Sequence, residues 1–160
     1  ATGQTGIMIA GEGMPLDSVV ADFIAGAAEV LSPNASPDHI DVIEGQGSIF
    51  HPSYAGVALG LLHGSQPDRF VVCHEPGRTH VLGHPEFPLP SIEQVIEQTI
   101  VLGRLTNPAI RCAGISLNTA KLDTAGAERE IDSVAKRLSL PVADPMRGGP
   151  AFERLLDACE

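Results

Sequence analysis

The fold is decided by residues 110–143, IRCAGISLNTAKLDTAGAEREIDSVAKRLSLPVA. Residues 110–117 are a short apolar run of the kind found in strands buried on both faces of a parallel sheet. Residues 124–138 place their apolar side chains at helical spacing, and residues 140–143 are a second short apolar run. Strand, helix and strand in this order predict a right-handed βαβ crossover.

The same alternation continues toward both ends of the chain. Apolar runs predict two more strands at residues 40–43 and 69–73. Helical spacing predicts helices at residues 17–30, 52–62, 91–105 and 150–158, with Asp17 and Ser91 as N-caps and Gln94 completing a capping box with Ser91. We therefore predict an α/β fold, a doubly wound and mostly parallel sheet, with residues 1–160 in one domain. Residues 75–90, rich in Pro, Gly and His, are predicted to form a long loop.

Composition excludes several classes of partner. Ten basic and twenty acidic residues give a net charge of -10, which argues against a nucleic-acid partner and against an anionic membrane surface. No apolar run reaches the ~18 residues of a membrane span. Cys73, Cys112 and Cys159 are widely spaced, which favours a reduced, cytoplasmic setting over a disulfide framework. Cys73 and Cys112 lie in apolar runs and are expected to be buried. No metal site is expected, because the histidines of residues 74–84 lack zinc-site spacing.

Polar residues follow every predicted strand. EGQGS (44–48) follows residues 40–43, and HEPGR (74–78) follows residues 69–73. Asn118 and Thr119 follow the third strand, and DPMR (144–147) follows the last. Ligands of open α/β sheets bind outside the carboxyl ends of the strands. These stretches therefore predict a binding site along one edge of the sheet.

The residue types in these stretches suggest roles. Glu44 and His51 are candidates for proton transfer. Gly45 and Gly47 would let the backbone approach a phosphate or thioester and offer N–H donors. The alternative is a tight turn from strand to helix with a solvated glutamate.

Other candidates carry their own alternatives. Arg78 is suited to a bidentate contact with a substrate carboxylate. Asn118 either reads a purine edge or caps a turn. Residues 1–6, ATGQTG, suggest a strand end followed by an anion-facing loop, or a plain glycine-containing turn.

Four segments together resemble a known family. They are residues 1–29 (ATGQTGIMIAGEGMPLDSVVADFIAGAAE), 44–68 (EGQGSIFHPSYAGVALGLLHGSQPD), 114–119 (GISLNT) and 141–149 (PVADPMRGG). They resemble the C-terminal domain of a bacterial and archaeal family of P-loop-type proteins that includes a D-glutamate N-acetyltransferase. The resemblance extends over essentially the whole chain. The layout is also similar, more distantly, to dethiobiotin synthetase, which carries an EGxGG-like turn where residues 44–47 stand here.

The resemblance implies a P-loop NTPase-like fold and acetyl transfer from acetyl-CoA to D-glutamate or a related D-amino acid, in D-amino-acid catabolism. It implies Glu44 or His51 as the base, and Arg78 and Arg147 as partners of the substrate carboxylates. Residues implied to border the phosphates and nucleotide of the co-substrate are Gln4, Thr5, Gly45, Gln46, Gly47, Ser48 and Asn118. It also implies a homo-oligomer, because relatives in this family are often oligomers.

The likeness to dethiobiotin synthetase supports an alternative function, an ATP- or GTP-dependent ligase or kinase that uses Mg²⁺. A non-catalytic nucleotide-binding module is a third alternative. Hydride chemistry of the NAD-dependent epimerase type has no support, because the sequence contains neither GxGxxG nor YxxxK.

The sequence departs from the family in one respect. A phosphate-binding motif GxxxxGK[ST] occurs nowhere in residues 1–160. In the family, this motif comes before the part of the sequence that corresponds to residue 1. We expect the first strand, the P-loop and the first helix to come from another segment. The chain is expected to need that segment for stability, because a sheet without its strand leaves buried backbone groups unpaired.

Overall fold

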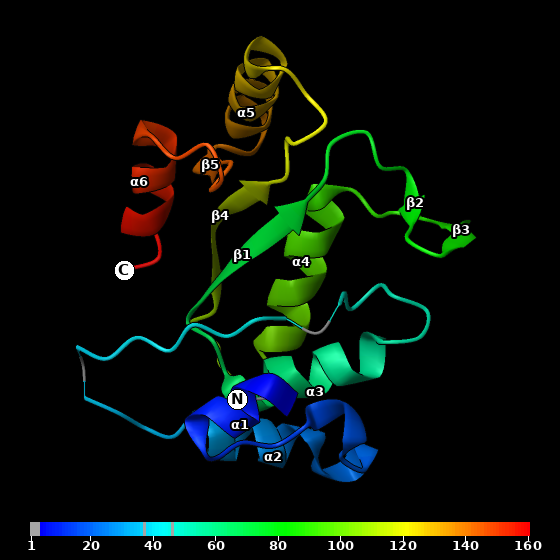
Figure 1. Cartoon of the computed structure of the whole chain (residues 1–160), viewed down its shortest axis with the longest axis vertical. Helices are drawn as coiled ribbons and strands as arrows, with labels where there is room; N and C mark the ends of the chain where they lie inside the picture. The colour runs from blue at the N-terminus through cyan, green and yellow to red at the C-terminus, as the bar shows by residue number, and fades with distance from the viewer. Residues whose placement is uncertain (1–3, 37, 46) are drawn as a thin grey trace. The chain divides into compact units, whose positions relative to one another are not determined.

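The computed structural model describes residues 4–36, 38–45 and 47–160 (Figure 1). These residues divide into two compact units. The helical unit comprises residues 1–67 and 101–108, and the sheet unit comprises residues 68–100 and 109–160. The single domain predicted for residues 1–160 stays a prediction.

The sheet unit contains a three-stranded parallel sheet. Its strands are β1 (Arg69–His74), β4 (Arg111–Leu117) and β5 (Val142–Ala143), in the order β1-β4-β5. These strands confirm three of the four predicted runs and the mostly parallel α/β class.

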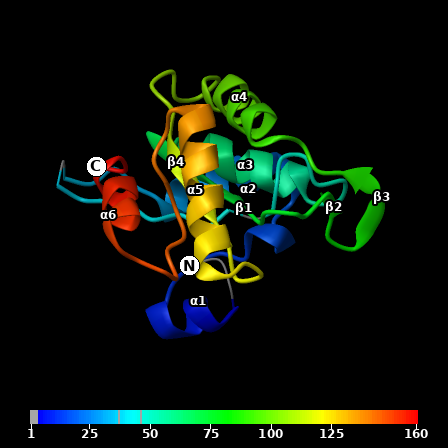
Figure 2. The same cartoon turned by 90° about the horizontal axis from the view of Figure 1, so that it is seen from above.

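Helices cover both faces of this sheet. They are α4 (Ile92–Gly103, of which residues 92–100 belong to this unit), α5 (Thr124–Leu138) and α6 (Pro150–Asp157). Ile92 of α4 and Val134 of α5 pack in one buried cluster with Ile115 of β4. Successive residues of a strand point to opposite faces, and a Cβ on Gly114 would meet Leu155 of α6, so α6 covers the other face. Figures 1 and 2 both show α4 and α6 on opposite sides of β4.

The predicted capping box of α4 is present. Ser91 N donates to Gln94 Oε1 at 2.8 Å, and Gln94 N donates to Ser91 Oγ at 3.2 Å. Helix α5 has a cap that the sequence reasoning missed, since Asp123 Oδ1 accepts from Gly126 N at 2.7 Å. Each cap satisfies backbone N–H groups that a helix start leaves without an intrahelical partner.

The predicted loop at residues 75–90 contains a short antiparallel ribbon instead. Its strands are β2 (His80–Val81) and β3 (His84–Pro88). Gly83 has φ 80°, a value that glycine adopts readily in a tight turn. Leu89 N closes the base of the ribbon by donating to Thr79 O at 2.9 Å.

The helical unit packs α3 against α2. Its elements are α1 (Gln4–Ala10), the 3₁₀ helices η1 (Leu16–Ser18) and η2 (Ala21–Phe23), α2 (Ile24–Leu31) and α3 (Ala55–Ser65). Leu16, Ala27, Ala28 and Leu61 form its buried core. Gly64 of α3 lies so close to α2 that a Cβ there would collide with Ala25 O and Ala28 Cβ.

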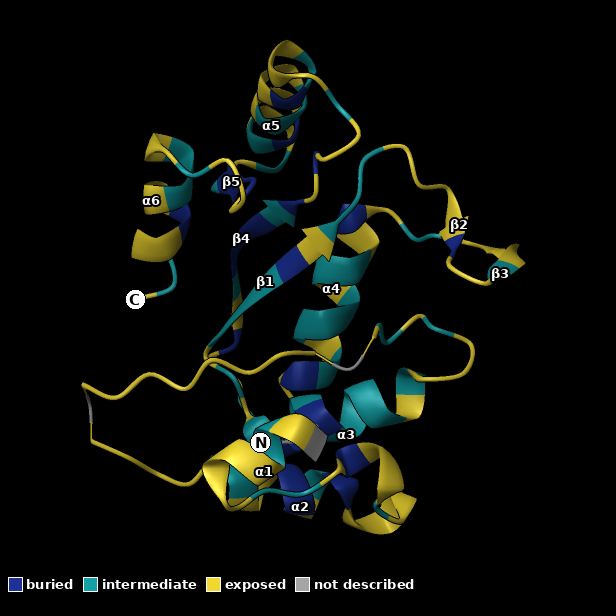
Figure 3. Ribbon diagram, in the orientation of Figure 1, coloured by how far each residue is buried: buried dark blue, intermediate teal, exposed yellow. Residues whose placement is uncertain are grey.

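Residues 40–43 form no strand, so that prediction is wrong. Val42 is 94% exposed and Ile40 66% exposed, and Figure 3 shows most of the connection from α2 to α3 as exposed. A strand is stabilised by hydrogen bonds to a neighbouring strand. A β-branched composition shows only that a segment has a preference for strand conformation. In the described part of the helical unit this stretch has no strand to pair with.

The predictions for the first 30 residues also need correction. Asp17 lies inside η1 and caps no α-helix, because buried Leu16 holds that turn in the core and α2 begins only at Ile24. Thr5 lies in helix α1 and not in an anion-facing loop, and residues 1–3 lie outside the described residues. The helix ends at Gly11, whose φ of 76° and N–H bond to Ile7 O at 2.9 Å form a C-cap.

The cysteines were predicted only in part. Cys73 is exposed, so its predicted burial is wrong, and the remaining thiols are half-buried. Burial raises the pKa of the Cys112 thiol to about 11. All three cysteines are free.

Candidate active site at the carboxyl edge of the sheet

Three loops meet at the carboxyl edge of the sheet unit. Asn118 N donates to His74 O at 2.8 Å, which extends the pairing of β1 and β4 by one residue. Lys121, in the loop after β4, forms an ion pair with Glu75, which follows β1. Arg147, in the loop after β5, donates to Leu122 O at 2.9 Å. Three of the four predicted polar stretches therefore lie together.

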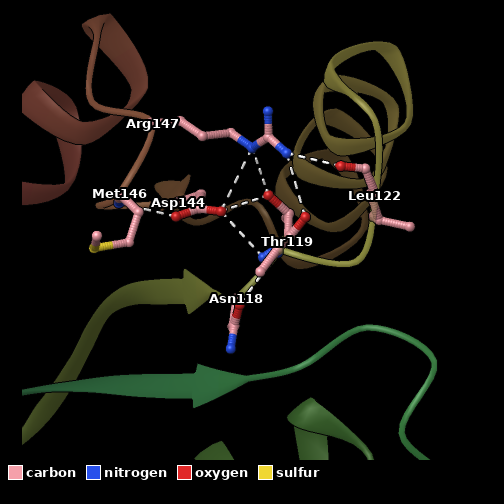
Figure 4. Close-up of polar contacts among 7 residues, drawn as sticks. Asn118, Thr119, Leu122, Asp144, Met146 and Arg147 are labelled. Carbon is pink, nitrogen blue, oxygen red and sulfur yellow. Dashed lines mark hydrogen bonds and ion pairs between the residues drawn. The ribbon is translucent and has the colours of Figure 1, made fainter.

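A buried carboxylate organises the loops after β4 and β5 (Figure 4). Asp144 is 5% exposed, and its Oδ2 accepts from Thr119 N at 3.0 Å and from the Thr119 hydroxyl. Its Oδ1 accepts from Met146 N at 2.9 Å. Burial by itself raises the pKa of Asp144, but the bonds from Thr119 and Met146 and the charge of Arg147 outweigh it, so the pKa lies below its usual value. The site therefore holds this aspartate ionised.

Arg147 is held by the same cluster. Its Nε donates to Thr119 Oγ1 at 2.7 Å, and its Nη2 donates to Thr119 O at 3.3 Å and to Leu122 O. Nε also lies 3.6 Å from Asp144 Oδ2. In Figure 4 the remaining terminal nitrogen, Nη1, points away from the other labelled residues. A ligand would therefore meet Arg147 through Nη1 and not through the paired Nε and Nη2 edge.

Glu75 lies between two cations. It forms ion pairs with Arg78 through one oxygen and with Lys121 through the other. The Glu75 side chain is 11% exposed, whereas Arg78 is 37% and Lys121 78% exposed. The contact with Lys121 is the main cause that holds the pKa of Glu75 below its usual value, with Arg78 adding to it against the effect of burial.

Asn118 and His74 complete this edge. Asn118 Oδ1 accepts from Ala120 N at 3.2 Å, so its oxygen caps the turn. Its side-chain nitrogen points away from Asp144 and Arg147 in Figure 4, and a purine contact through that nitrogen stays a prediction. Burial is the main cause that lowers the pKa of His74, which favours the neutral imidazole at pH 7.

The predicted catalytic pair lies in the helical unit. Glu44 and Gly45 are exposed, and Glu44 lines a cavity of about 260 Å³ together with residues of α2 and α3. His51 Nδ1 accepts from Ser53 N at 3.1 Å, which leaves Nε2 as the protonated nitrogen of the neutral ring. The His51 ring centre lies 4.7 Å from that of Tyr54.

The other predicted cofactor-binding residues lie in this unit too. Gly47 has φ 76°, and Ser48 Oγ accepts from Phe50 N at 3.1 Å, so both belong to a tight turn. Thr5 is exposed on α1, and Gln4 is the first residue of that helix. Gln46 lies outside the described residues.

Glu75, Thr119 and Asp144 lie in the polar stretches predicted from the sequence but were assigned no role, and Lys121 lies outside those stretches. The available signal was a polar residue placed directly after a buried strand. Thr119 is fully buried and Asp144 nearly so, and burial cannot be read from residue type, because both residues are usually exposed.

No helix among the described residues is both long enough and apolar enough to span a membrane. Within the same residues, no three His, Cys, Asp or Glu side chains lie close enough together to bind a metal ion.

Comparison with known proteins gives a consistent result. A family model described as "Domain of unknown function (DUF1611_C) P-loop domain" matches residues 1–156. A D-glutamate N-acetyltransferase from Tritonibacter scottomollicae is 48% identical over 158 residues, which are 99% of this chain and 47% of that protein. One from Pseudoalteromonas sp. is 50% identical over 149 residues, 93% of this chain and 45% of that protein.

A solved structure is also similar to this chain. The crystal structure of a DUF1611 family protein from Anabaena variabilis ATCC 29413 matches with a TM-score of 0.86 and 37% sequence identity. The match covers 99% of this chain and 46% of that one. The chain thus spans slightly less than half the length of each of these three proteins.

Proposed function

The chain belongs to the DUF1611 C-terminal P-loop domain family, and on that premise we propose that it forms part of an N-acetyltransferase acting on D-glutamate or a related D-amino acid. The observation that carries the proposal is identity of 48% and 50%, over nearly the whole chain, to two proteins named D-glutamate N-acetyltransferase. Acetyl-CoA would be the acyl donor, and the protein would act in D-amino-acid catabolism.

The proposed reaction forms a bond between the amino nitrogen and the acetyl carbon and breaks the bond from that carbon to sulfur. The amine must lose a proton to attack, and we assign that proton to Glu44 or His51. The CoA thiolate leaves and takes up a proton. Backbone N–H groups of residues 45–48 are proposed to stabilise the charge on the thioester oxygen.

The remaining proposed contacts come from Arg78, Arg147 and Asn118 at the carboxyl edge of the sheet and, in the helical unit, from Gln4 and Thr5 of α1. Arg78 is proposed to bind a substrate carboxylate, and Arg147 a second one through Nη1. Asn118, Gln4 and Thr5 are proposed to contact the nucleotide and phosphates of CoA. Asp144, held ionised, keeps the loop that carries Arg147 in place.

The decisive experiment is a CoA-release assay on the intact protein with D-glutamate and acetyl-CoA. We expect release that depends on D-glutamate and proceeds without Mg²⁺. Arg78→Ala should raise KM for D-glutamate more than KM for acetyl-CoA. Equal increases in KM for D-glutamate and in KM for acetyl-CoA would argue against a specific contact between Arg78 and D-glutamate.

A nucleotide-dependent ligase or kinase is the second candidate, favoured by the P-loop named in the family description. It predicts binding and turnover of ATP or GTP that require Mg²⁺. Titration of the intact protein with Mg·ATP and with acetyl-CoA separates the two candidates. Binding of Mg·ATP without any D-glutamate-dependent CoA release would favour the second one.

A further part of the proposal concerns the sheet. Ile40 and Val42 are 66% and 94% exposed, and both are β-branched residues that favour strands. We propose that a strand from outside residues 1–160, with the P-loop and a dethiobiotin synthetase-like layout, pairs with residues 40–43. A cytoplasmic location and a homo-oligomer complete the proposal, the location being supported by three free cysteines.

A further inference from the structure

Lys121 is the most exposed charged side chain of the cluster around Glu75, and nothing in the proposed function above uses it. Its side chain is 78% exposed, and it reaches from the loop after β4 to Glu75 in the loop after β1. Arg78 reaches the other oxygen of the same carboxylate. Two cations are thus held side by side by a carboxylate that is itself 11% exposed.

The charges in this cluster do not cancel. Glu75 offsets one of the two positive charges, which leaves one unit of positive charge for Arg78 and Lys121 together. His74 adds none at neutral pH, because burial lowers the pKa of its ring. Asp123 follows in the same loop and keeps its negative charge while it caps α5, but it makes no ion pair with Arg78 or Lys121 in the described structure. In a chain of net charge -10, the three side chains in contact, Glu75, Arg78 and Lys121, thus carry one net positive charge.

The geometry also matches a definite ligand group. Glu75 shows that one carboxylate spans both cations, with one oxygen on each. The ammonium of Lys121 has three donors and the guanidinium of Arg78 has five, so Glu75 does not use all of the donors of either side chain. A second carboxylate is the simplest group to take them.

We infer that Arg78 and Lys121 together bind one carboxylate of an amino-dicarboxylic acid substrate, with Glu75 as the residue that positions both cations. The inference rests on the proposed function and deepens it, since it explains how a dicarboxylic amino acid is told apart from one with a single carboxylate. Arg78 and Lys121 bind one carboxylate of the substrate, and Arg147 binds the other. Charge-assisted hydrogen bonds of this kind are about twice as strong as neutral ones.

The sequence supplies a matched control. The chain contains two lysines, Lys121 and Lys136, and Lys136 is exposed on α5. Lys121→Gln and Lys136→Gln therefore make the same change in composition and in net charge. Ion pairs of exposed lysines contribute little to stability, so both variants should unfold within a degree or two of the parent protein.

The test is calorimetric titration of the intact protein and each variant with D-glutamate, glutarate, D-alanine and acetyl-CoA. We expect Lys121→Gln to lower the affinity for D-glutamate and glutarate about tenfold, and we expect Lys121→Arg to retain most of the affinity of the parent protein. D-alanine and acetyl-CoA should bind as before, and Lys136→Gln should leave all four ligands unaffected.

Several outcomes would overturn the inference. One is that the parent protein acetylates D-glutamate, and Lys121→Gln binds D-glutamate as tightly as the parent protein does. That outcome would leave the proposed function intact. Another is a loss confined to acetyl-CoA, which would assign the cation pair to the phosphates of CoA.

Failure of the proposed function gives a different pattern. One result is that the protein acetylates no D-amino acid, while Lys121→Gln binds glutarate less tightly than the parent protein. This result would support the carboxylate-binding role of Arg78 and Lys121 and contradict the proposed reaction. Absence of binding by any dicarboxylate to the parent protein would overturn both.

Discussion

The hydroxyl of Thr119 shows how one buried atom can join the loops after β4 and β5. It donates to Asp144 and accepts from Arg147 Nε at 2.7 Å, while the Thr119 carbonyl accepts from Arg147 Nη2. Neither partner has a second hydroxyl in this cluster to replace it. The network is complete only when all three side chains are present, so its members should behave as a unit on mutation.

Replacing Thr119 with valine keeps the shape but removes the hydroxyl. We expect Thr119→Val to lower the free energy of unfolding by ~2 kcal/mol, because a buried carboxylate loses one donor and a guanidinium loses its acceptor. Thr119→Ser keeps the hydroxyl and should cost about 1 kcal/mol, mainly for the lost methyl group. Urea denaturation monitored by circular dichroism measures both. Equal losses in the two variants would show that the hydroxyl is not the important group.

Asp144 makes stability depend on pH in a definite direction. Its pKa is lower in the folded protein than in the unfolded chain, so the folded state favours the ionised form. This contribution is fully present above the unfolded pKa of about 3.9 and is lost as the pH falls through the folded value.

The pH dependence is tested by comparing Asp144→Asn with the parent protein by urea denaturation between pH 7 and pH 2.5. The variant should be less stable at pH 7, and the difference should shrink below about pH 4. Asp132→Asn, on an exposed position of α5, serves as the control and should show little difference at any pH. A difference for Asp144→Asn that stays constant across this range would contradict a buried, ionised carboxylate.

At the residue scale, the sequence correctly indicated where some side chains lie, whereas the roles predicted for them stay predictions. Arg147 and Asn118 were selected because cationic and amide side chains follow buried strands, and both lie at the carboxyl edge of the sheet. What the sequence did not show is that the Nε and Nη2 donors of Arg147 are already used within the loops. Hydrogen-bond partners are set by the tertiary fold, since Thr119 and Arg147 are 28 residues apart.

At the scale of elements, the close packing of α3 against α2 depends on Gly64. A Cβ at Gly64 would collide with the backbone of α2 at Ala25 O, and backbone has no rotamer by which to move aside. Gly56 belongs to the same helix, but a Cβ there would meet nothing within 4 Å. The two positions therefore separate the effect of helix packing from that of helix propensity.

Gly64→Ala should destabilise the protein by about 3 kcal/mol, because α3 must shift away from α2 and lose contacts in the core of the helical unit. Gly56→Ala should be neutral or stabilising by about 0.5 kcal/mol, since alanine favours the helix. Thermal and urea denaturation of both variants check these values. A similar loss at both positions would mean that the two helices are not in close contact.

Elements were predicted well where the pattern itself determines the structure. Helix α5 has the predicted bounds because Ala127 and Val134 fall on one face and that face is buried. Strand β4 was recognised from an uninterrupted apolar run. The run at residues 40–43 looks equally strand-like, yet Val42 is 94% exposed. A strand requires a partner that no local pattern can supply.

At the scale of the whole molecule, the chain spans slightly less than half of its relatives. A pairing strand would form hydrogen bonds with the backbone N–H and C=O groups of residues 40–43. We expect the backbone amides of residues 40–43 to exchange hydrogen slowly in the intact protein and quickly in the 160-residue chain alone. Hydrogen exchange with mass spectrometry measures this. Equally fast exchange in both would argue against a pairing strand.

The close seam between α2 and α3 has a consequence for sequence variation in the family. A Cβ at residue 60 would collide with the side chain of Ile24, so the two positions share one fixed volume. A larger residue at position 60 is tolerated only when position 24 becomes smaller. Across related chains, side-chain size at these two positions should therefore vary inversely, whereas residue 64, which faces backbone, should remain glycine.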